Sequence, residues 1–272
     1  MTASHMACYP VGPRGEIFMR LRQFVFVAEK LDPAVEEINS VLGLEVCYTD
    51  PGVAEFGLEN ALFALGGNFL EIVAPTRDGT SAGRYLERRG GNGGYMVILQ
   101  CDDAVAHRKR IKAHGIREVW AHNGPEAFAT HFHPADVGGA ILSIDSMASA
   151  PDYHVDMASW KWAGSSWQGH VKTDTSSALV GLELQSDDPQ GLADTWSKVL
   201  DIPLTKKAHA PSLALDNASL GFVEGRDGRG QGAGGLLIQP QNRPAILAEA
   251  EKRGLRTGDN TFTMCGVRVT LT

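Results

Sequence analysis

The sequence predicts an α+β fold in which four β-α-β-β-β units are paired into two modules. Short apolar strand segments recur four times along the 272 residues. A helix pattern with an Asp or Pro start follows each of these segments, and further strand signals follow the helices, separated by turns such as Asp-Pro-Gly and Gly-Gly. Repetition of one strand-helix-strand pattern is typical of a fold built from similar units.

The first two units make up the first module, residues 18–147. Gly43 and Gly115 suit the left-handed position that ends a helix. Asp103 can accept hydrogen bonds from the free N–H groups at the start of the second helix. The expected helices are 31–42 and 103–112, and the expected strands are 23–27, 44–49, 60–65, 68–74, 95–100, 118–121, 130–133 and 140–145.

The second module, residues 177–272, repeats this pattern as a degenerate copy. Leu192, Trp196 and Leu200 recur at helical spacing and predict one buried stripe. Pro189 and Pro244 suit the first turn of a helix. The expected opening strands are 180–184 and 235–239, and the expected helices are 188–200 and 243–252.

Two segments lie outside the modules. Residues 1–17 are interpreted as a disordered N-terminal segment or a tag remnant, and 148–176 as a Trp-rich linker. The linker holds Trp160, Trp162 and Trp167, which is unusual for a free connection. We expect these rings to staple one module to the other, with a ligand lid as the alternative.

Composition excludes several classes of protein. The net charge is −7 and no basic block occurs, so no nucleic-acid partner is expected. No apolar stretch approaches the ~20 residues of a membrane helix. The four cysteines form no C-x-x-C pair and no signal peptide is evident, which predicts reduced thiols and a cytoplasmic protein. The Gly-rich stretch 225–235 lacks the Lys-Ser or Lys-Thr of a phosphate loop, so no nucleotide cofactor is expected.

Several motifs resemble one known superfamily. Leu21-Arg-Gln23 is similar to the start of glyoxalase I, and Phe69-Leu-Glu-Ile-Val-Ala-Pro75 to the strand that carries its glutamate ligand. His133-Pro-Ala-Asp-Val-Gly-Gly139 resembles the closing hairpin of the methylmalonyl-CoA epimerase branch. The chain is thereby identified as a member of the vicinal oxygen chelate superfamily, the glyoxalase, bleomycin-resistance and extradiol-dioxygenase group. The resemblance implies that each module folds its strands into a cup with the site inside.

The resemblance also implies a metal held by four inward positions. These fall at Gln23, Glu71, Met96 and Ser143 in the first module. A thioether and a hydroxyl are poor ligands for divalent metals, so we expect one weakly held divalent metal or none. The matching positions of the second module fall at Gly181 and Gly235 and near Val223 and Thr270, and they offer no metal site.

Strand alternation directs Glu71 into the cup, because Leu70, Ile72 and Ala74 supply the opposite face. Glu71 is the expected base, with Tyr95 or His131 as the acid. A structural pairing of Glu71 with Gln23 or an arginine stays open. The expected substrate contacts are Gln23, Met96, Ser143, His133 and Arg84, and the alternative metal ligands are Gln23, Glu71, His131 and His133.

The sequence thus predicts a glyoxalase-like protein whose first module acts on a small oxygenated organic molecule. Lyase or isomerase chemistry by proton transfer is the preferred hypothesis. A non-catalytic small-molecule binder similar to bleomycin-resistance proteins is the alternative, and an extradiol-type dioxygenase is less favoured. A homodimer is compatible with the sequence.

Overall fold

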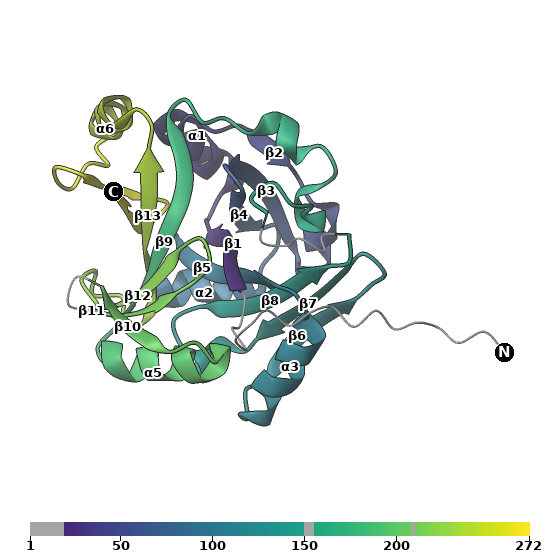
Figure 1. The fold of residues 1–272 in the computed structure, drawn as a ribbon. Helices are drawn as coiled ribbons and strands as arrows, with labels where there is room; N and C mark the ends of the chain where they lie inside the picture. Colours follow the sequence, from purple (N-terminus) through teal and green to yellow (C-terminus); the bar gives the residue numbers. More distant parts are fainter. Residues whose placement is uncertain (1–18, 150–154, 208–209) are drawn as a thin grey trace.

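The computed structural model describes residues 19–149, 155–207 and 210–272. The expected N-terminal segment 1–17, with Cys8, lies outside these residues. The α+β fold with two cup-shaped modules is confirmed (Figure 1). In Figure 1 the elements of the first module run from purple to teal, and those of the second module run from green to yellow.

The strands of the first module follow the spatial order β2-β3-β4-β1-β5-β8-β7-β6. Strands β1 and β5 run antiparallel at the centre, and each pairs in parallel with the last strand of its own unit, β4 or β8. The elements are β1 (Met19–Val27), α1 (Leu31–Leu42), β2 (Val46–Tyr48), η1 (Pro51–Phe56), β3 (Leu58–Leu65), β4 (Asn68–Pro75), α2 (Ser81–Arg89), β5 (Gly93–Cys101), α3 (Ala104–Ala113), β6 (Glu118–Asn123), β7 (Ala127–Phe132), α4 (Pro134–Val137) and β8 (Ile141–Met147).

The second module follows the order β10-β11-β12-β9-β13-β15-β14 and joins the first sheet where Ala233 pairs with Gly94. Its last unit has lost one strand: between α6 and β14 the described residues form only the bridge of Arg256 with Phe262. The elements are β9 (Ser176–Ser186), α5 (Pro189–Leu200), β10 (Leu204–Lys207), β11 (Ala210–Ala214), β12 (Ser219–Glu224), β13 (Gly232–Pro240), α6 (Arg243–Lys252), β14 (Thr261–Met264) and β15 (Val267–Leu271).

The helix ends follow the local chemistry of the sequence. Asp103 accepts hydrogen bonds from the N–H groups of Val105 and Ala106, and Asp188 accepts one from Gly191. Helix α1 ends at Gly43, whose φ of 68° is the left-handed conformation that glycine tolerates. The predicted ranges of α1 and α6 agree with the structure.

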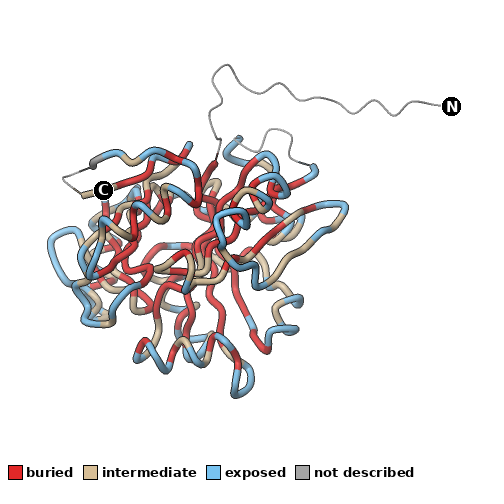
Figure 2. Tube along the Cα trace, turned by 90° about the horizontal axis from the view of Figure 1, so that it is seen from below, coloured by how far each residue is buried: buried red, intermediate tan, exposed pale blue. Residues whose placement is uncertain are grey.

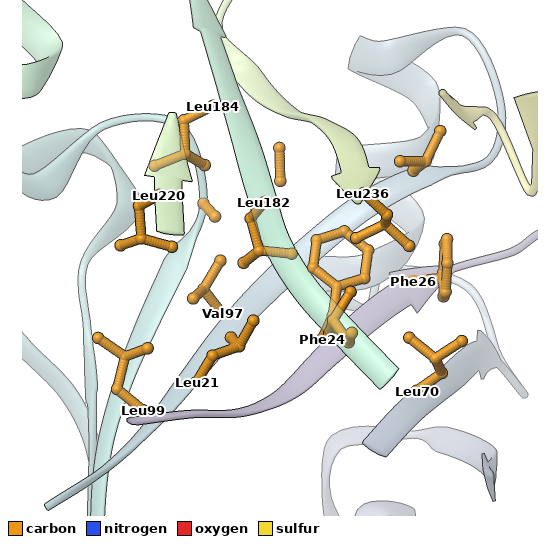
Figure 3. Close-up of a cluster of buried hydrophobic side chains, with 14 of the residues drawn as sticks. Leu21, Phe24, Phe26, Leu70, Val97, Leu99, Leu182, Leu184, Leu220 and Leu236 are labelled. Carbon is orange, nitrogen blue, oxygen red and sulfur yellow. The ribbon is translucent and has the colours of Figure 1, made fainter. Parts of the chain in front are cut away.

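One hydrophobic core is shared by the two modules. Leu21 and Phe24 of β1 and Val97 of β5 belong to the same buried cluster as Leu182 of β9 and Leu236 of β13 (Figure 3). Figure 2 shows the buried strands gathered in the middle of the molecule and the exposed turns at its rim. The outer face of the first sheet therefore packs on the second module, which leaves the inner face of the first cup for a separate cluster.

The segment 155–171, here called the Trp strap, fills part of the first cup. It contains η2 (Lys161–Ala163) and η3 (Trp167–His170). Trp160 and Trp167 are buried in a cluster made only of residues from the first module and the strap. The prediction that these tryptophans staple the modules together is therefore wrong.

A buried arginine holds the strap in place. Arg22 of β1 donates hydrogen bonds to the carbonyl oxygens of Asp156 and Ala158 at 3.1 and 2.5 Å. Its guanidinium lies 5.2 to 5.5 Å from the ring centroids of Phe69, Trp160 and Trp167. Cation–π contacts and backbone hydrogen bonds thus replace a carboxylate partner for this side chain.

None of the helices among the described residues combines the length and the apolar composition that a bilayer span requires. Cys47, Cys101 and Cys265 are free and buried.

Candidate active site

A cavity of about 360 Å³ lies in the cup of the first module. Its walls come from all eight strands of the first module, β1 to β8, from η1 and from the Trp strap. Five predicted site residues line it, namely Gln23, Glu71, Tyr95, Met96 and His131. The cavity therefore brings together residues that lie up to 108 positions apart, from Gln23 to His131.

Glu71 is held by two neutral amides. The Gln23 side chain donates to Oε2 and the Asn60 side chain donates to Oε1, both at 2.6 Å. Trp160 of the strap donates in turn to the amide oxygen of Gln23 at 2.8 Å. Glu71 is 7% exposed, and burial raises its pKa to about 7 although the two hydrogen bonds act in the opposite direction.

Asp145 of β8 is a second carboxyl group on the same cavity. Ser143 donates to its Oδ1 at 2.5 Å, and Trp162 of the strap donates to its Oδ2 at 2.7 Å. Asp145 is 2% exposed, and burial raises its pKa to about 7 against these two hydrogen bonds. Both carboxyl groups thus accept hydrogen bonds from neutral donors. The strap contacts Asp145 directly through the indole of Trp162, and it reaches Glu71 only through Gln23, to which Trp160 donates.

The pairing of the strands relates the inward positions in the two halves of the first module. Gln23 pairs with Phe69, two residues before Glu71, and also pairs across the centre with Ile98. Ile98 pairs with Ser143, two residues before Asp145. Met96 pairs with Ile141, two residues before Ser143, so Met96 and Ser143 repeat in β5 and β8 the register of Gln23 and Glu71 in β1 and β4. Asp145 follows Ser143 on the same face of β8.

Two further polar side chains line the cavity, and no hydrogen bond of the Tyr95 hydroxyl or of the His131 ring occurs among the described residues. Burial raises the pKa of Tyr95 to about 12, so the hydroxyl stays protonated at neutral pH. His131 packs its ring 4.5 Å from that of Trp120. Burial lowers the pKa of His131 to about 4, which leaves the imidazole neutral at neutral pH.

Three predicted substrate contacts lie elsewhere. Ser143 is buried beneath Asp145 and serves as its hydrogen-bond donor. His133 follows the end of β7 and caps α4, where its Nδ1 accepts from the N–H of Ala135, so it does not share a strand face with His131. Arg84 is exposed and donates to Gly79 and Ser81 at the start of its own helix.

The donor set does not fit a resident divalent metal. The four implied positions hold Gln23, Glu71, Met96 and Ser143, and a thioether and a hydroxyl are poor ligands for divalent metals. Each oxygen of the two carboxyl groups already accepts a hydrogen bond, as does the amide oxygen of Gln23. The alternative ligand set with His131 and His133 fails as well, because His133 is bound to α4.

One group of three potential ligands occurs among the described residues, at Cys101, Asp102 and His107, outside the cavity. Arg110 lies 3.1 Å from Nδ1 of His107, and this nitrogen must accept because a guanidinium only donates. The Cys101 thiol is buried and its pKa is raised well above the ordinary value, chiefly by burial. A neighbouring guanidinium and a protonated thiol both disfavour a cation here.

Sequence reasoning missed Asn60, Asp145 and the direct role of the strap. Asn60 lies opposite Glu71 only through the register of β3 on β4, where Leu62 pairs with Glu71. Asp145 was within the expected strand 140–145 but two residues beyond the position assigned. The tryptophan cluster was a usable signal, although the hydrogen bonds of Trp160 to Gln23 and of Trp162 to Asp145 could not be predicted from spacing.

Two curated relatives match about half of the chain. An ethylmalonyl-CoA/methylmalonyl-CoA epimerase of Cereibacter sphaeroides is 23% identical over 135 residues, which cover 47% of this chain and 98% of the relative. The mitochondrial methylmalonyl-CoA epimerase of Mus musculus is 24% identical over 132 residues, which cover 46% of this chain and 72% of the relative. The matched length is that of one module.

A solved structure matches nearly the whole chain. A hypothetical protein from Staphylococcus aureus superposes with a TM-score of 0.65 at 12% identity, covering 94% of this chain and 99% of the other. This likeness concerns the fold alone. The same arrangement of elements therefore occurs in a protein with a very different sequence.

The model of the glyoxalase-like domain matches residues 24–200. The match begins within β1, passes through both halves of the first cup and the Trp strap, and ends with α5. More than half of the chain is covered, including every cavity-lining residue except Gln23. This chain is therefore a member of the glyoxalase-like domain family of the vicinal oxygen chelate superfamily.

Proposed function

We propose that the cup of the first module carries out proton transfer of the isomerase type on a small oxygenated carbon acid. One observation carries the proposal: Glu71 and Asp145 enter one cavity from β4 and β8, the last strands of the two units, and no cation among the described residues pairs with either of them. Both groups have a pKa raised to about 7 by burial. At neutral pH one can be ionised while the other is protonated, as an acid and base pair requires.

Each group then has a defined part in the reaction. The Glu71 carboxylate takes the proton from carbon, and the electron pair of the broken C–H bond moves into an enolate. The Tyr95 hydroxyl donates a hydrogen bond to the enolate oxygen, and the neutral imidazole of His131 is the second available donor. The Asp145 carboxylic acid returns a proton to the same carbon, and exchange with water restores both groups.

The named activities of the curated relatives support this reaction class, because an epimerase moves a proton at carbon. Their acyl-CoA substrates are not carried over to this chain. Among the described residues that line the cavity the one permanent cation is Lys161, whose ammonium lies 3.0 Å from Glu126. A carboxylated and phosphorylated substrate would find little there to pair with. A cytoplasmic location and a homodimer remain part of the proposal.

A non-catalytic binder is the second candidate. The observation that favours it is that all four carboxyl oxygens already accept hydrogen bonds from the protein. In that case the carboxyl groups would only give the cup its shape and polarity. The two candidates differ in whether bound ligand exchanges hydrogen with solvent.

The test uses 2-tetralone, an uncharged bicyclic ketone with acidic C–H bonds beside its carbonyl. Its exchange in deuterated buffer is followed by proton NMR, with binding measured in the same samples. We expect the protein to accelerate exchange, and Glu71→Gln or Asp145→Asn to remove about 100-fold of that acceleration. Glu224→Gln, on the far module, is the matched control and should retain it. Binding of 2-tetralone without accelerated exchange would reject proton transfer in favour of the binder.

A further inference from the structure

Acidic side chains outnumber basic ones on the wall of the cup. Among the described residues that line the cavity, four carry carboxyl groups, namely Asp50, Glu55, Glu71 and Asp145. The single lysine, Lys161, is paired with Glu126 at 3.0 Å and lies 5.9 Å from the ring of Trp162. No arginine lines the cavity among these residues. A carboxylate or phosphate entering the cup would therefore meet acidic groups without a free cation to pair with.

Aromatic rings form one continuous wall of the same cavity. The rings of Phe56 and Trp120 lie 6.0 Å apart, those of Trp120 and His131 4.5 Å apart, and those of His122 and Trp162 5.4 Å apart. Trp120 also stacks on His122 at 6.2 Å. Such a wall offers flat, electron-rich faces that attract planar rings and cations.

The acids at the mouth are separate from the buried pair. Phe56 and Glu55 are exposed, and Asp50 is half-buried at the start of η1. Asp50 caps η1 by accepting from the N–H of Gly52, and Glu55 accepts from the indole N–H of Trp120 at 3.2 Å. Both side chains are thus fixed beside the aromatic wall, where their charge acts on an entering ligand.

We infer that the cup binds a planar aromatic molecule that is uncharged or positively charged, and that it excludes carboxylated and phosphorylated ligands. This names the ligand class of the site and rests on the proposed function only in taking the cup as the place where the ligand binds. The cavity of about 360 Å³ lies within the range of small-molecule pockets and is large enough for a bicyclic ring. The aromatic wall supplies the affinity, and the acids supply the selection by charge.

The test compares three probes of one size that differ in charge: 2-tetralone, the 2-naphthylmethylammonium cation and 2-naphthoate. Their dissociation constants are measured by calorimetry at neutral pH. We expect the neutral and cationic probes to bind at least about tenfold more tightly than the anion. Equal or tighter binding of 2-naphthoate overturns the inference, and so does a failure of all three probes to bind.

Two sets of variants locate the effect. Asp50→Asn with Glu55→Gln keeps both hydrogen-bond acceptors but removes two charges, and it should narrow the preference for cation over anion about threefold or more. The control, Glu224→Gln with Asp259→Asn, makes the same change of net charge on the second module and should leave the preference unchanged. An equal effect of both pairs would overturn the inference, because net charge alone would then decide binding.

Trp120→Ala should weaken the binding of the neutral and cationic probes about tenfold, since it removes the centre of the aromatic wall. Unchanged affinity would place the probes outside the cup and overturn the inference. Selective binding without hydrogen exchange would reject the proposed reaction and leave this inference standing. Hydrogen exchange of 2-tetralone without any preference among the three probes would overturn this inference and leave the proposed reaction standing.

Discussion

The inner faces of the two modules differ in the partners that they give to a carboxyl group. In the first, Glu71 meets only neutral donors, the amides of Gln23 and Asn60. In the second, Glu183 of β9 forms an ion pair with Arg268 of β15 at 2.5 Å. Gly235 lies between these strands, and a Cβ there would approach the Glu183 carboxylate to 2.5 Å, so the glycine makes room for the ion pair.

This difference indicates which module can carry out proton transfer. An arginine partner holds a carboxylate ionised, because the charged form is favoured by the opposite charge. A carboxyl group buried among neutral donors has a pKa close to neutrality and can exchange its proton. The two modules share a fold, but only the first presents such groups in a cavity among the described residues.

The largest expected effect separates the strap from the shared core. Trp167 fills the first cup, whereas Trp196 of α5 belongs to the core shared by both modules and donates to the carbonyl of Gly138. Changing either residue to Ala removes a fully buried indole and should cost roughly 3–5 kcal/mol of unfolding free energy. Only Trp167→Ala should also weaken the binding of 2-tetralone. Chemical denaturation and calorimetry measure the two effects, and equal loss of binding in both variants would contradict the comparison.

The next effect is a dependence of stability on pH. Glu71 has a folded pKa of about 7 and an ordinary value of 4.5, so between these values the folded chain binds more protons than the unfolded chain. Stability therefore falls as pH rises through this window and levels off above about 7. Glu71→Gln removes this contribution. The free energy of unfolding of the variant, relative to that of the wild type, should therefore rise by about 3 kcal/mol at most between about pH 5 and pH 8.

Unfolding in urea at the two pH values measures this difference. A constant penalty is also expected in Glu71→Gln, since one amide N–H then faces another donor, but it is the same at both pH values and cancels. Glu183→Gln in the second module is the control. Its partly exposed ion pair should contribute no more than about 1 kcal/mol to the free energy of unfolding. Parallel pH profiles of wild type and Glu71→Gln would show that burial does not perturb Glu71.

The smallest expected effect is that of a chelator. Every carboxyl oxygen of Glu71 and Asp145 accepts a hydrogen bond from the protein, and the other two implied positions, Met96 and Ser143, offer only a thioether and a hydroxyl. Millimolar EDTA should leave the melting temperature and the exchange of 2-tetralone unchanged. A loss of exchange that added zinc or manganese restores would instead favour a metal-dependent reaction.

The site was only partly predictable from the sequence. The alternation of Leu70, Ile72 and Ala74 directed Glu71 to the inner face, and the structure places it beside Gln23. The contact with Asn60 depends on the register of β3 against β4, which no local pattern specifies. Arg84 was placed near the cup by resemblance, but its hydrogen bonds are local to α2.

The sequence by itself determined the repeated units, the helix ends and the side of each strand that is buried. These features follow from the spacing of apolar residues and from capping by Asp103, Asp188 and Gly43, which act within a few residues of the chain. Only the tertiary structure decided that the Trp strap enters the first cup, that Asp145 shares a cavity with Glu71, and that neither carboxyl group pairs with a cation in the part of the chain that the structure describes. These outcomes depend on strand register and long-range burial, because a pKa and a cavity are properties of groups brought together from distant parts of the chain.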